Sequence, residues 1–212
     1  MGKITGMEAA HEVPPKVLLL YAAVEQLIVE GQDLSAVKVS TITEKAGIGK
    51  GTAYDYFETK DDIIACALVY HTRKMSEELA NDILKKESFE EKINFLLDEI
   101  ERGNGRRQYF LRFVHILTEN TGYCQLVRQK MSSEEFKGYM PVSLFQKIVK
   151  ESVARGEIRS DLPAEYVISC VASRIFMYMV HFCAENCLLV NPTEMRPYIC
   201  NGILNELCEK NI

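Results

Sequence analysis

The chain has 212 residues, of which 47% are hydrophobic and 26% are charged, a composition typical of a folded globular protein rather than a disordered one. It contains no apolar run of the roughly 18 residues that a membrane helix requires, and no basic leader precedes the first predicted helix, so we expect a cytoplasmic protein without a membrane partner. The formal net charge of −5 argues at first against a nucleic-acid partner.

The seven cysteines and four histidines give no sign of a metal centre or an active site. No Cys-x-x-Cys pair occurs, which argues against a zinc ribbon or a thioredoxin-like motif, and the odd number of cysteines indicates reduced thiols. The histidines form no His-Glu-x-x-His motif, and neither a serine elbow nor a Walker glycine pattern is present. We therefore expect no enzyme activity, no cofactor and no bound metal.

The first third of the chain predicts three helices separated by short breaks. Two prolines begin the first helix and a glycine ends it, which places it at about residues 14 to 29. The second helix covers about residues 39 to 46, and the third begins near Lys50. Gly47 and Gly49 lie between them and predict a tight turn in which positive φ costs little. The pattern is a helix-turn-helix whose second helix has one buried face and one face for a groove.

The rest of the chain also predicts helices only. Thr59 lies three residues before Asp62 in an N-cap pattern, which begins a long helix that continues to about residue 84. Ser88 and Glu91 form a capping box for the next helix. Further helices are expected at about 107–119, after Gly122, at about 132–155 with a bend at Pro141, from 163 and from 193. The predicted fold class is all-α, with about nine helices in a three-helix amino-terminal head and a larger helical body.

Residues 37 to 62 read VKVSTITEKAGIGKGTAYDYFETKDD. This stretch resembles the DNA-binding signature of the TetR/AcrR family of transcriptional regulators. The family pattern runs Ala-Gly-Val-Ser-Lys-Gly-Thr-Leu-Tyr, followed by an aromatic pair ending in Phe and a helix start similar to Lys-Glu-Asp. Residues 46–54, 56–57 and 60–62 occupy these positions here. An ordinary helical hairpin with a glycine turn is the alternative, but it does not require so many matching positions.

The resemblance implies a set of DNA contacts, because in that family the recognition helix enters the major groove and flanking residues hold phosphates. Lys50 suits a phosphate or a guanine edge, Gly51 permits close backbone approach, and Lys60 is placed for a phosphate. The positions expected on or near DNA are Lys38, Ser40, Thr41, Lys50, Gly51, Thr52, Tyr54, Tyr56 and Lys60.

Three positions depart from the family pattern. Val37 and Lys38 stand where threonine is usual, so either the helix cap shifts to Ser40 or Lys38 replaces the hydroxyl contact with a charge. Ala53 thins the packing under the recognition helix. Asp55 either accepts from a cytosine amino group or faces solvent. Residues 1–66 contain six lysines, no arginine and ten carboxylates, so we expect few phosphate contacts per subunit.

The resemblance further implies two domains: a DNA-binding domain at residues 14–62 and a body at residues 63–212 that binds a small-molecule effector and forms a dimer. Aromatic residues are the candidates for the effector pocket, although each could instead belong to the ordinary core. The candidates are Phe110, Phe113, His115, Phe136, Tyr139, Phe145, Phe176 and Tyr178.

Residues 166–189 are apolar around nearly the whole helix, apart from a narrow polar stripe of Arg174, Tyr178, His181 and Glu185. A helix buried on several faces fits packing against both its own body and a partner. TetR-like proteins pair their last two long helices, so we expect a homodimer formed through about residues 163–188 and 193–209. A fully intramolecular core helix is the alternative.

We therefore expect a ligand-responsive regulator, a repressor that binds a pseudo-palindromic operator in double-stranded DNA and is released by a small-molecule effector. The alternative is a TetR-like helical dimer that acts mainly as a protein-interaction module or a thiol sensor. Cys183 and Cys187 share a helix face and would form such a sensor, whereas His181 points elsewhere.

Overall fold

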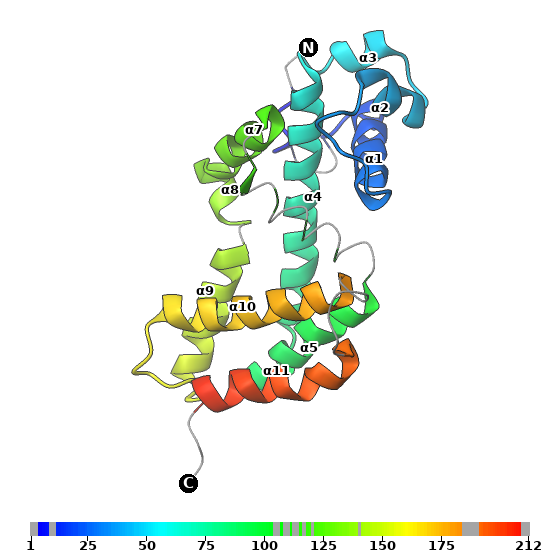
Figure 1. Ribbon diagram of the computed structural model, residues 1–212. Helices are drawn as coiled ribbons and strands as arrows, with labels where there is room; N and C mark the ends of the chain where they lie inside the picture. Colours follow the sequence, from blue (N-terminus) through cyan, green and yellow to red (C-terminus); the bar gives the residue numbers. More distant parts are fainter. Residues whose placement is uncertain are drawn as a thin grey trace. The chain divides into compact units, whose positions relative to one another are not determined.

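A computed structural model of the chain describes residues 4–8, 12–103, 107, 111, 115, 118–119, 121–139, 141–183 and 191–208. Within these ranges the regular structure is helical and no strand is found, so the predicted all-α fold class is confirmed (Figure 1). None of the helices described in these ranges is long and apolar enough to cross a membrane. The chain divides into two compact units: unit 1 is Met1–Ser76 with Gln108–Met140, and unit 2 is Glu77–Arg107 with Pro141–Ile212.

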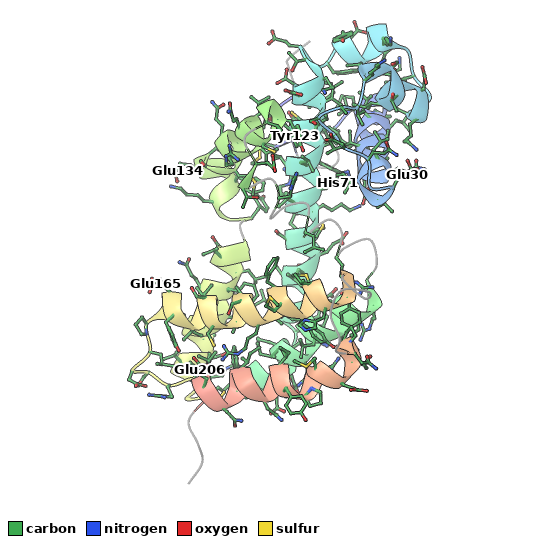
Figure 2. The ribbon with its side chains drawn as sticks, viewed as in Figure 1. Glu30, His71, Tyr123, Glu134, Glu165 and Glu206 are labelled. Atoms are coloured by element: carbon green, nitrogen blue, oxygen red, sulfur yellow. The ribbon has the colours of Figure 1, made fainter. Side chains whose placement is uncertain are left out.

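Unit 1 holds the predicted head together with parts of the predicted body. Its helices are α1 (Pro15–Val29), α2 (Val39–Lys45), α3 (Lys50–Tyr54), most of α4 (Lys60–Ile83), α7 (Gly122–Met131) and α8 (Glu134–Lys137). One hydrophobic cluster joins buried side chains of α1 to residues 63–70 of α4 and to Tyr123, Cys124 and Val127 of α7 (Figure 2). The predicted boundary between residues 62 and 63 therefore passes through one packed core, and the functional division stays a prediction.

Short-range hydrogen bonds fix the starts of two helices, α4 and α5 (Phe89–Arg102). Both Thr59 N and Thr59 Oγ1 donate to Asp62 Oδ2, at 3.0 and 2.8 Å, and Asp62 N donates back to Thr59 Oγ1 at 3.1 Å. Ser88 and Glu91 form a complete capping box at the start of α5. These hydrogen bonds confirm both predicted caps. Each cap satisfies amide groups that the first turn of a helix leaves without a partner.

Unit 2 is built around the two helices at the end of the chain. It contains α5, α9 (Pro141–Ala154), α10 (Ala164–Cys183) and α11 (Pro192–Leu207), together with the end of α4. α10 and α11 run side by side, both contact α5, and α9 contacts α10 (Figure 1). Ile93 and Leu97 of α5 and Ile203 and Leu207 of α11 are fully buried in this unit.

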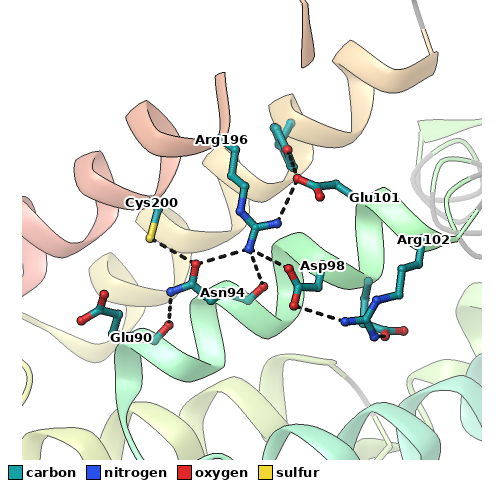
Figure 3. A network of polar contacts seen from close by, with 9 residues as sticks. Glu90, Asn94, Asp98, Glu101, Arg102, Arg196 and Cys200 are labelled. Atoms are coloured by element: carbon teal, nitrogen blue, oxygen red, sulfur yellow. Dashed lines mark hydrogen bonds and ion pairs between the residues drawn. The ribbon is translucent and has the colours of Figure 1, made fainter. Parts of the chain in front are cut away.

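A polar network holds the three central helices of unit 2 together (Figure 3). Arg196 of α11 places Nη2 2.6 Å from Asp98 Oδ1 and Nη1 2.9 Å from Glu101 Oε1, both on α5. The hydroxyl of Tyr178 on α10 donates to the same Glu101 oxygen at 2.5 Å. Charge-assisted hydrogen bonds of this kind are stronger than neutral ones, so the network fixes the register of α10 and α11 on α5.

The segment from 132 to 155 differs from the sequence prediction of one bent helix. Two separate helices are found there, α8 and α9, and Pro141 is the first residue of α9. Proline has no amide hydrogen and disfavours the helical conformation in the residue before it, so it begins a helix more readily than it bends one. The helix predicted at 107–119 lies largely outside the described residues, as do residues 184–188 of the helix predicted at about 163–188.

Candidate nucleic-acid interface

The turn between α2 and α3 is closed by a Schellman motif. Ile48 N donates to Thr43 O at 3.0 Å and Gly47 N donates to Glu44 O at 3.1 Å, while Gly47 has φ 67° in the left-handed region. This conformation favours glycine because a side chain would be strained there. Gly49 has extended backbone angles, φ −76° and ψ 150°. Of the two glycines expected in the turn, only Gly47 is required by the backbone.

The inner face of α3 packs against the head as predicted. Ala53 is fully buried and Phe57 is 3% exposed. The Phe57 ring lies 6.3 Å from the ring of Tyr21 on α1, and the Tyr21 ring lies 5.1 Å from that of Tyr70 on α4. Aromatic contacts at these separations add to the burial of apolar surface and fix the orientation of the short helix.

The outer face of α3 carries the residues expected to meet DNA. Lys50 and Gly51 are exposed, and Tyr54 is 52% exposed. Thr52 and Tyr56 are half-buried at the edges of this face. A Cβ added to Gly51 would meet no atom within 4 Å, so the protein's own packing does not require glycine at this position. The geometry is that of a short helix with a polar, accessible face above a packed one.

The structure divides the lysines of the motif into two groups. In the part of the chain that the structure describes, Lys38 and Lys50 are exposed and make no ion pair. Lys45 Nζ instead pairs with Glu30 Oε1 at 2.8 Å, and Lys60 Nζ donates to Ser35 O at 2.6 Å. An ammonium group has three donors, so the contact with Ser35 leaves Lys60 able to bind a phosphate as well.

The start of α2 decides between the two alternatives for its cap. Lys38 is the N-cap residue and its side chain makes no capping hydrogen bond. Ser40 lies within the first turn, where its carbonyl oxygen accepts from Thr43 Oγ1 at 3.1 Å. The first alternative, a cap shifted to Ser40, is therefore wrong, and the second, a charge contact by Lys38, stays a prediction. Thr41 is exposed on the same turn. The helix begins without a side-chain cap, and Lys38 at its N-cap position is exposed and makes no ion pair with the described residues.

The sequence reasoning missed the loop between α1 and α2 as a supporting element. Asp33 Oδ1 accepts from Ser35 N at 2.9 Å and from Ser35 Oγ at 2.7 Å. This Asx turn presents the Ser35 carbonyl to Lys60. An Asp two residues before a Ser is a recognised local signal, so the turn could have been predicted from the sequence, although its partner on α4 could not.

The candidate effector residues of unit 1 only partly come together. Phe136 is fully buried in the same hydrophobic cluster as the head core, with its ring 6.2 Å from that of Tyr139. His115 is exposed, and its Nδ1 lies 3.9 Å from Glu119 Oε1, four residues further along the chain. Phe110 and Phe113 lie outside the described residues. Among the candidates of this unit that the structure describes, Phe136 and Tyr139 lie together.

The remaining effector candidates belong to unit 2. Tyr178 is fully buried and bonded to Glu101, while Phe145 and Phe176 are half-buried. The polar stripe expected on α10 makes contacts within the unit, because the buried Tyr178 bonds to Glu101 of α5 and Arg174 pairs with Glu206 of α11. Roles in ligand binding stay predictions for these residues.

Large apolar side chains remain exposed on the last two helices. Tyr166 and Met177 of α10 are 47% and 45% exposed, and Tyr198 of α11 is 74% exposed. The side chain of Cys183 and all of Cys187 lie outside the described positions, so the proposed thiol pair is not visible. Among the described residues no group of His, Cys, Asp and Glu is arranged to hold a metal ion.

Comparison with known proteins agrees with this motif. Residues 19–66 match the model of the family described as bacterial regulatory proteins, tetR family. The fatty acid metabolism regulator protein of Bacillus subtilis (strain 168) is 29% identical over 152 residues, which cover 70% of this chain and 73% of that protein.

Solved structures share the fold. The transcriptional regulator FadR from Bacillus subtilis in complex with stearoyl-CoA superposes with a TM-score of 0.67 at 18% identity, covering 88% of this chain and 97% of FadR. NalD of Pseudomonas aeruginosa, the secondary repressor of a multidrug efflux pump, has a TM-score of 0.62 at 14% identity and covers 92% of this chain and 98% of its own. The helix-turn-helix of residues 37–62, the family match over residues 19–66 and the relative from Bacillus subtilis together identify the amino-terminal part of this chain as a helix-turn-helix domain of the tetR family of bacterial regulatory proteins.

Proposed function

We propose that this regulator is a homodimeric repressor that binds a pseudo-palindromic operator in double-stranded DNA and is released by a small-molecule effector. The outer face of α3 carries the proposal, because Lys50, Gly51 and Tyr54 are accessible above the buried Ala53 and Phe57. A partner on chromosomal DNA implies that the protein acts in the cytoplasm.

The proposed contacts sort into base reading and backbone positioning. Lys50 and Thr52 on α3 would reach base edges or phosphates in the major groove. The phenol groups of Tyr54 and Tyr56, together with Lys38, Ser40, Thr41 and Lys60, would donate to phosphate oxygens. Each head offers DNA only three of these cations, Lys38, Lys50 and Lys60, so its affinity for a single half-site should be modest. Tight binding to the operator then requires both heads to bind at the same time.

The proposed dimer uses the faces of α10 and α11 that are exposed in the single chain. Tyr166, Met177 and Tyr198 expose large apolar or aromatic side chains there. Large apolar side chains left exposed on a surface can form an interaction site, and a two-fold axis would place the same faces of both subunits against each other. Two heads related by this axis would meet half-sites one or more helical turns apart.

The proposed effector is a long-chain acyl-CoA thioester. The relative from Bacillus subtilis is named a fatty acid metabolism regulator, and FadR, which shares the fold, was solved with stearoyl-CoA. An acyl chain requires an apolar, aromatic lining. Phe110, Phe113, His115, Phe136, Tyr139, Phe145, Phe176 and Tyr178 are the proposed lining residues.

Footprinting on the DNA that flanks the protein's own gene tests this function. We expect a protected pseudo-palindrome at low salt, and loss of protection when stearoyl-CoA is added at micromolar concentration but not when free CoA is added. A folded dimer that protects no site would favour the protein-interaction alternative. Protection that stearoyl-CoA leaves unchanged would retain the DNA-binding function and reject this effector class.

A further inference from the structure

Residues 4–8, here called the arm, are held against α4 by a buried arginine. Arg73 of α4 is 7% exposed and donates from Nη1 to Met7 O and from Nη2 to Glu8 O, each at 2.6 Å. Carbonyl groups that accept from a buried guanidinium form strong, directional contacts. The arm is therefore a fixed part of unit 1.

A second cation holds the arm from another helix. Lys130, near the end of α7, donates from Nζ to Thr5 O at 2.8 Å. The arm is also closed on itself, because Glu8 Oε1 accepts from Thr5 N at 2.6 Å and from Thr5 Oγ1 at 2.9 Å, and Glu8 Oε2 accepts from Gly6 N at 3.0 Å. The arm thus presents its carbonyl groups outward, to Arg73 on α4 and to Lys130 on α7.

Gly6 brings the arm closer to α4 than any other residue could. Its φ is 84°, and a Cβ added there would lie 2.8 Å from the carbonyl oxygen of Cys66 and 2.9 Å from Cys66 Cα. The clash is with backbone atoms that cannot turn aside. Cys66 is 1% exposed, and its Sγ lies 3.6 Å from Ile4 O. The docked arm therefore covers one side of Cys66, next to its thiol.

The opposite end of α7 is also fastened to α4. A Cβ at Gly122, the first residue of α7, would overlap the carboxylate of Asp61 in the first turn of α4. α7 is therefore held at its start by direct contact with α4, and near its end through the arm. The arm precedes α1 in the chain, so it connects α7 to the helix on which the recognition motif packs.

We propose that the arm is a coupling strap that transmits displacement between α7 and the DNA-binding head. A shift of α7 that keeps the contact between Lys130 and Thr5 would pull on the arm, which is also fastened to α4 and precedes α1 in the chain. In the reverse direction, a head fixed on DNA restrains the arm and thereby α7. The regulatory part of this inference rests on the proposed function, and the physical coupling does not.

Two variants release the strap, and each has a matched control. Gly6→Ala introduces the clash with Cys66, whereas Gly156→Ala imposes the same kind of left-handed strain, at φ 70°, with no atom within 4 Å of the new Cβ. Lys130→Met removes the donor to Thr5, whereas Lys137→Met removes an exposed lysine paired with Glu134 on its own helix. Lys130→Met also serves if Gly6→Ala folds poorly.

The first measurement uses the protein alone. Burial raises the pKa of the Cys66 thiol to about 11, so labelling by a maleimide should be slow in the wild type. Gly6→Ala should speed Cys66 labelling and amide hydrogen exchange in both the arm and α7 by about tenfold or more. Gly156→Ala should change neither. Unchanged Cys66 labelling in Gly6→Ala would contradict the docked arm, and exposed Cys66 with unchanged exchange in α7 would overturn the coupling.

The second measurement adds DNA and effector. Operator DNA should slow amide exchange in α7 of the wild type but not of Gly6→Ala or Lys130→Met. The ratio of operator Kd with and without stearoyl-CoA should fall at least about threefold in both variants and stay unchanged in both controls. A wild-type ratio in a variant whose arm is undocked would overturn the strap. A wild type that binds no operator would reject the proposed function instead, and the exchange data on the protein alone would still decide the coupling.

Discussion

Lys60 Nζ lies 2.6 Å from the carbonyl oxygen of Ser35, so the first residue of α4 fastens the loop between α1 and α2. The same side chain occupies a position where TetR-like proteins are expected to bind a phosphate. A lysine that holds the loop while it binds DNA would connect the position of α4 to the position of α2. This dual role makes Lys60 the most informative cation of the motif to replace.

Lys60→Ala should weaken binding to all DNA sequences and reduce the slope of log K against log salt by about one, because one phosphate contact is lost. Lys85→Ala is the control, since that side chain is 71% exposed and pairs with Asp82 in unit 2. Fluorescence anisotropy at several salt concentrations measures both quantities. A weaker affinity with an unchanged slope would assign Lys60 to the loop alone.

Gly51→Ala should weaken operator binding by about tenfold or more without destabilising the protein. A Cβ at Gly51 has open space within the protein, and alanine favours a helix over glycine by about 0.5–1 kcal/mol. Only close approach of DNA would make the added methyl group unfavourable. Gly138→Ala, where a Cβ also meets nothing within 4 Å, is the control. Operator affinity within twofold of the wild type would place Gly51 away from the DNA.

Met177→Asp should produce monomers at concentrations where the wild type is a dimer, because a charge would be buried at the proposed interface. Val142→Asp on α9 is the matched control, since Met177 and Val142 are 45% and 48% exposed in the single chain. Sedimentation velocity distinguishes the two species. A Met177→Asp protein that remains dimeric would exclude this face of α10 from the interface, whereas dissociation of Val142→Asp would move the interface to α9.

From the buried position of His71 we expect the protein to lose stability on acidification. Its Nε2 lies 3.1 Å from Tyr21 O and its Nδ1 lies 3.6 Å from Glu25 Oε2. Burial lowers the pKa of His71 below its ordinary value, and the contacts with Glu25 and Tyr21 oppose this only in part. The unfolded chain therefore binds a proton more readily than the folded one. The stability that the folded protein gains from holding His71 neutral is present above the unfolded-state pKa of histidine. It is lost as the pH falls below that pKa toward the lower pKa of the folded state.

Denaturant unfolding between about pH 7.5 and about pH 5.5 measures this effect. The free energy of unfolding of the wild type should fall over this interval, and that of His71→Gln should fall less. His115→Gln, the same substitution at an exposed histidine, is the control. Equal slopes in all three proteins would show that the proton uptake occurs elsewhere.

Arg196→Met should destabilise the fold by about 1–3 kcal/mol, because it removes the closest cation from the partly buried Glu101 and leaves Asp98 with only its longer contact to Arg102. Arg102→Met removes a 67% exposed arginine of α5 that contacts the same Asp98 at 3.3 Å from the solvent side, and it should cost less than about 1 kcal/mol. Adding Glu101→Gln to Arg196→Met should restore part of the loss. Thermal unfolding of the three variants tests this, and equal losses for Arg196 and Arg102 would contradict a structural role for the network.

Several features of this molecule followed from the sequence because they depend on neighbours three to five residues apart. The Thr59–Asp62 and Ser88–Glu91 caps and the glycine at 47 each satisfy backbone groups within one turn, so residue types and spacing suffice to predict them. The break before Pro141 was mispredicted as a bend, although the exclusion of helix before proline is equally local.

The sequence by itself determined the helix-turn-helix, the all-α class and the family. Only the tertiary structure decided which cations are already engaged: Lys60 by Ser35, Arg73 by the arm and Arg196 by α5. Each of these contacts joins residues at least 25 positions apart in the chain. Spacing within a helix specifies which residues lie on the same face. A charged side chain pairs with a residue far away in the sequence only where packing brings another helix or loop beside it.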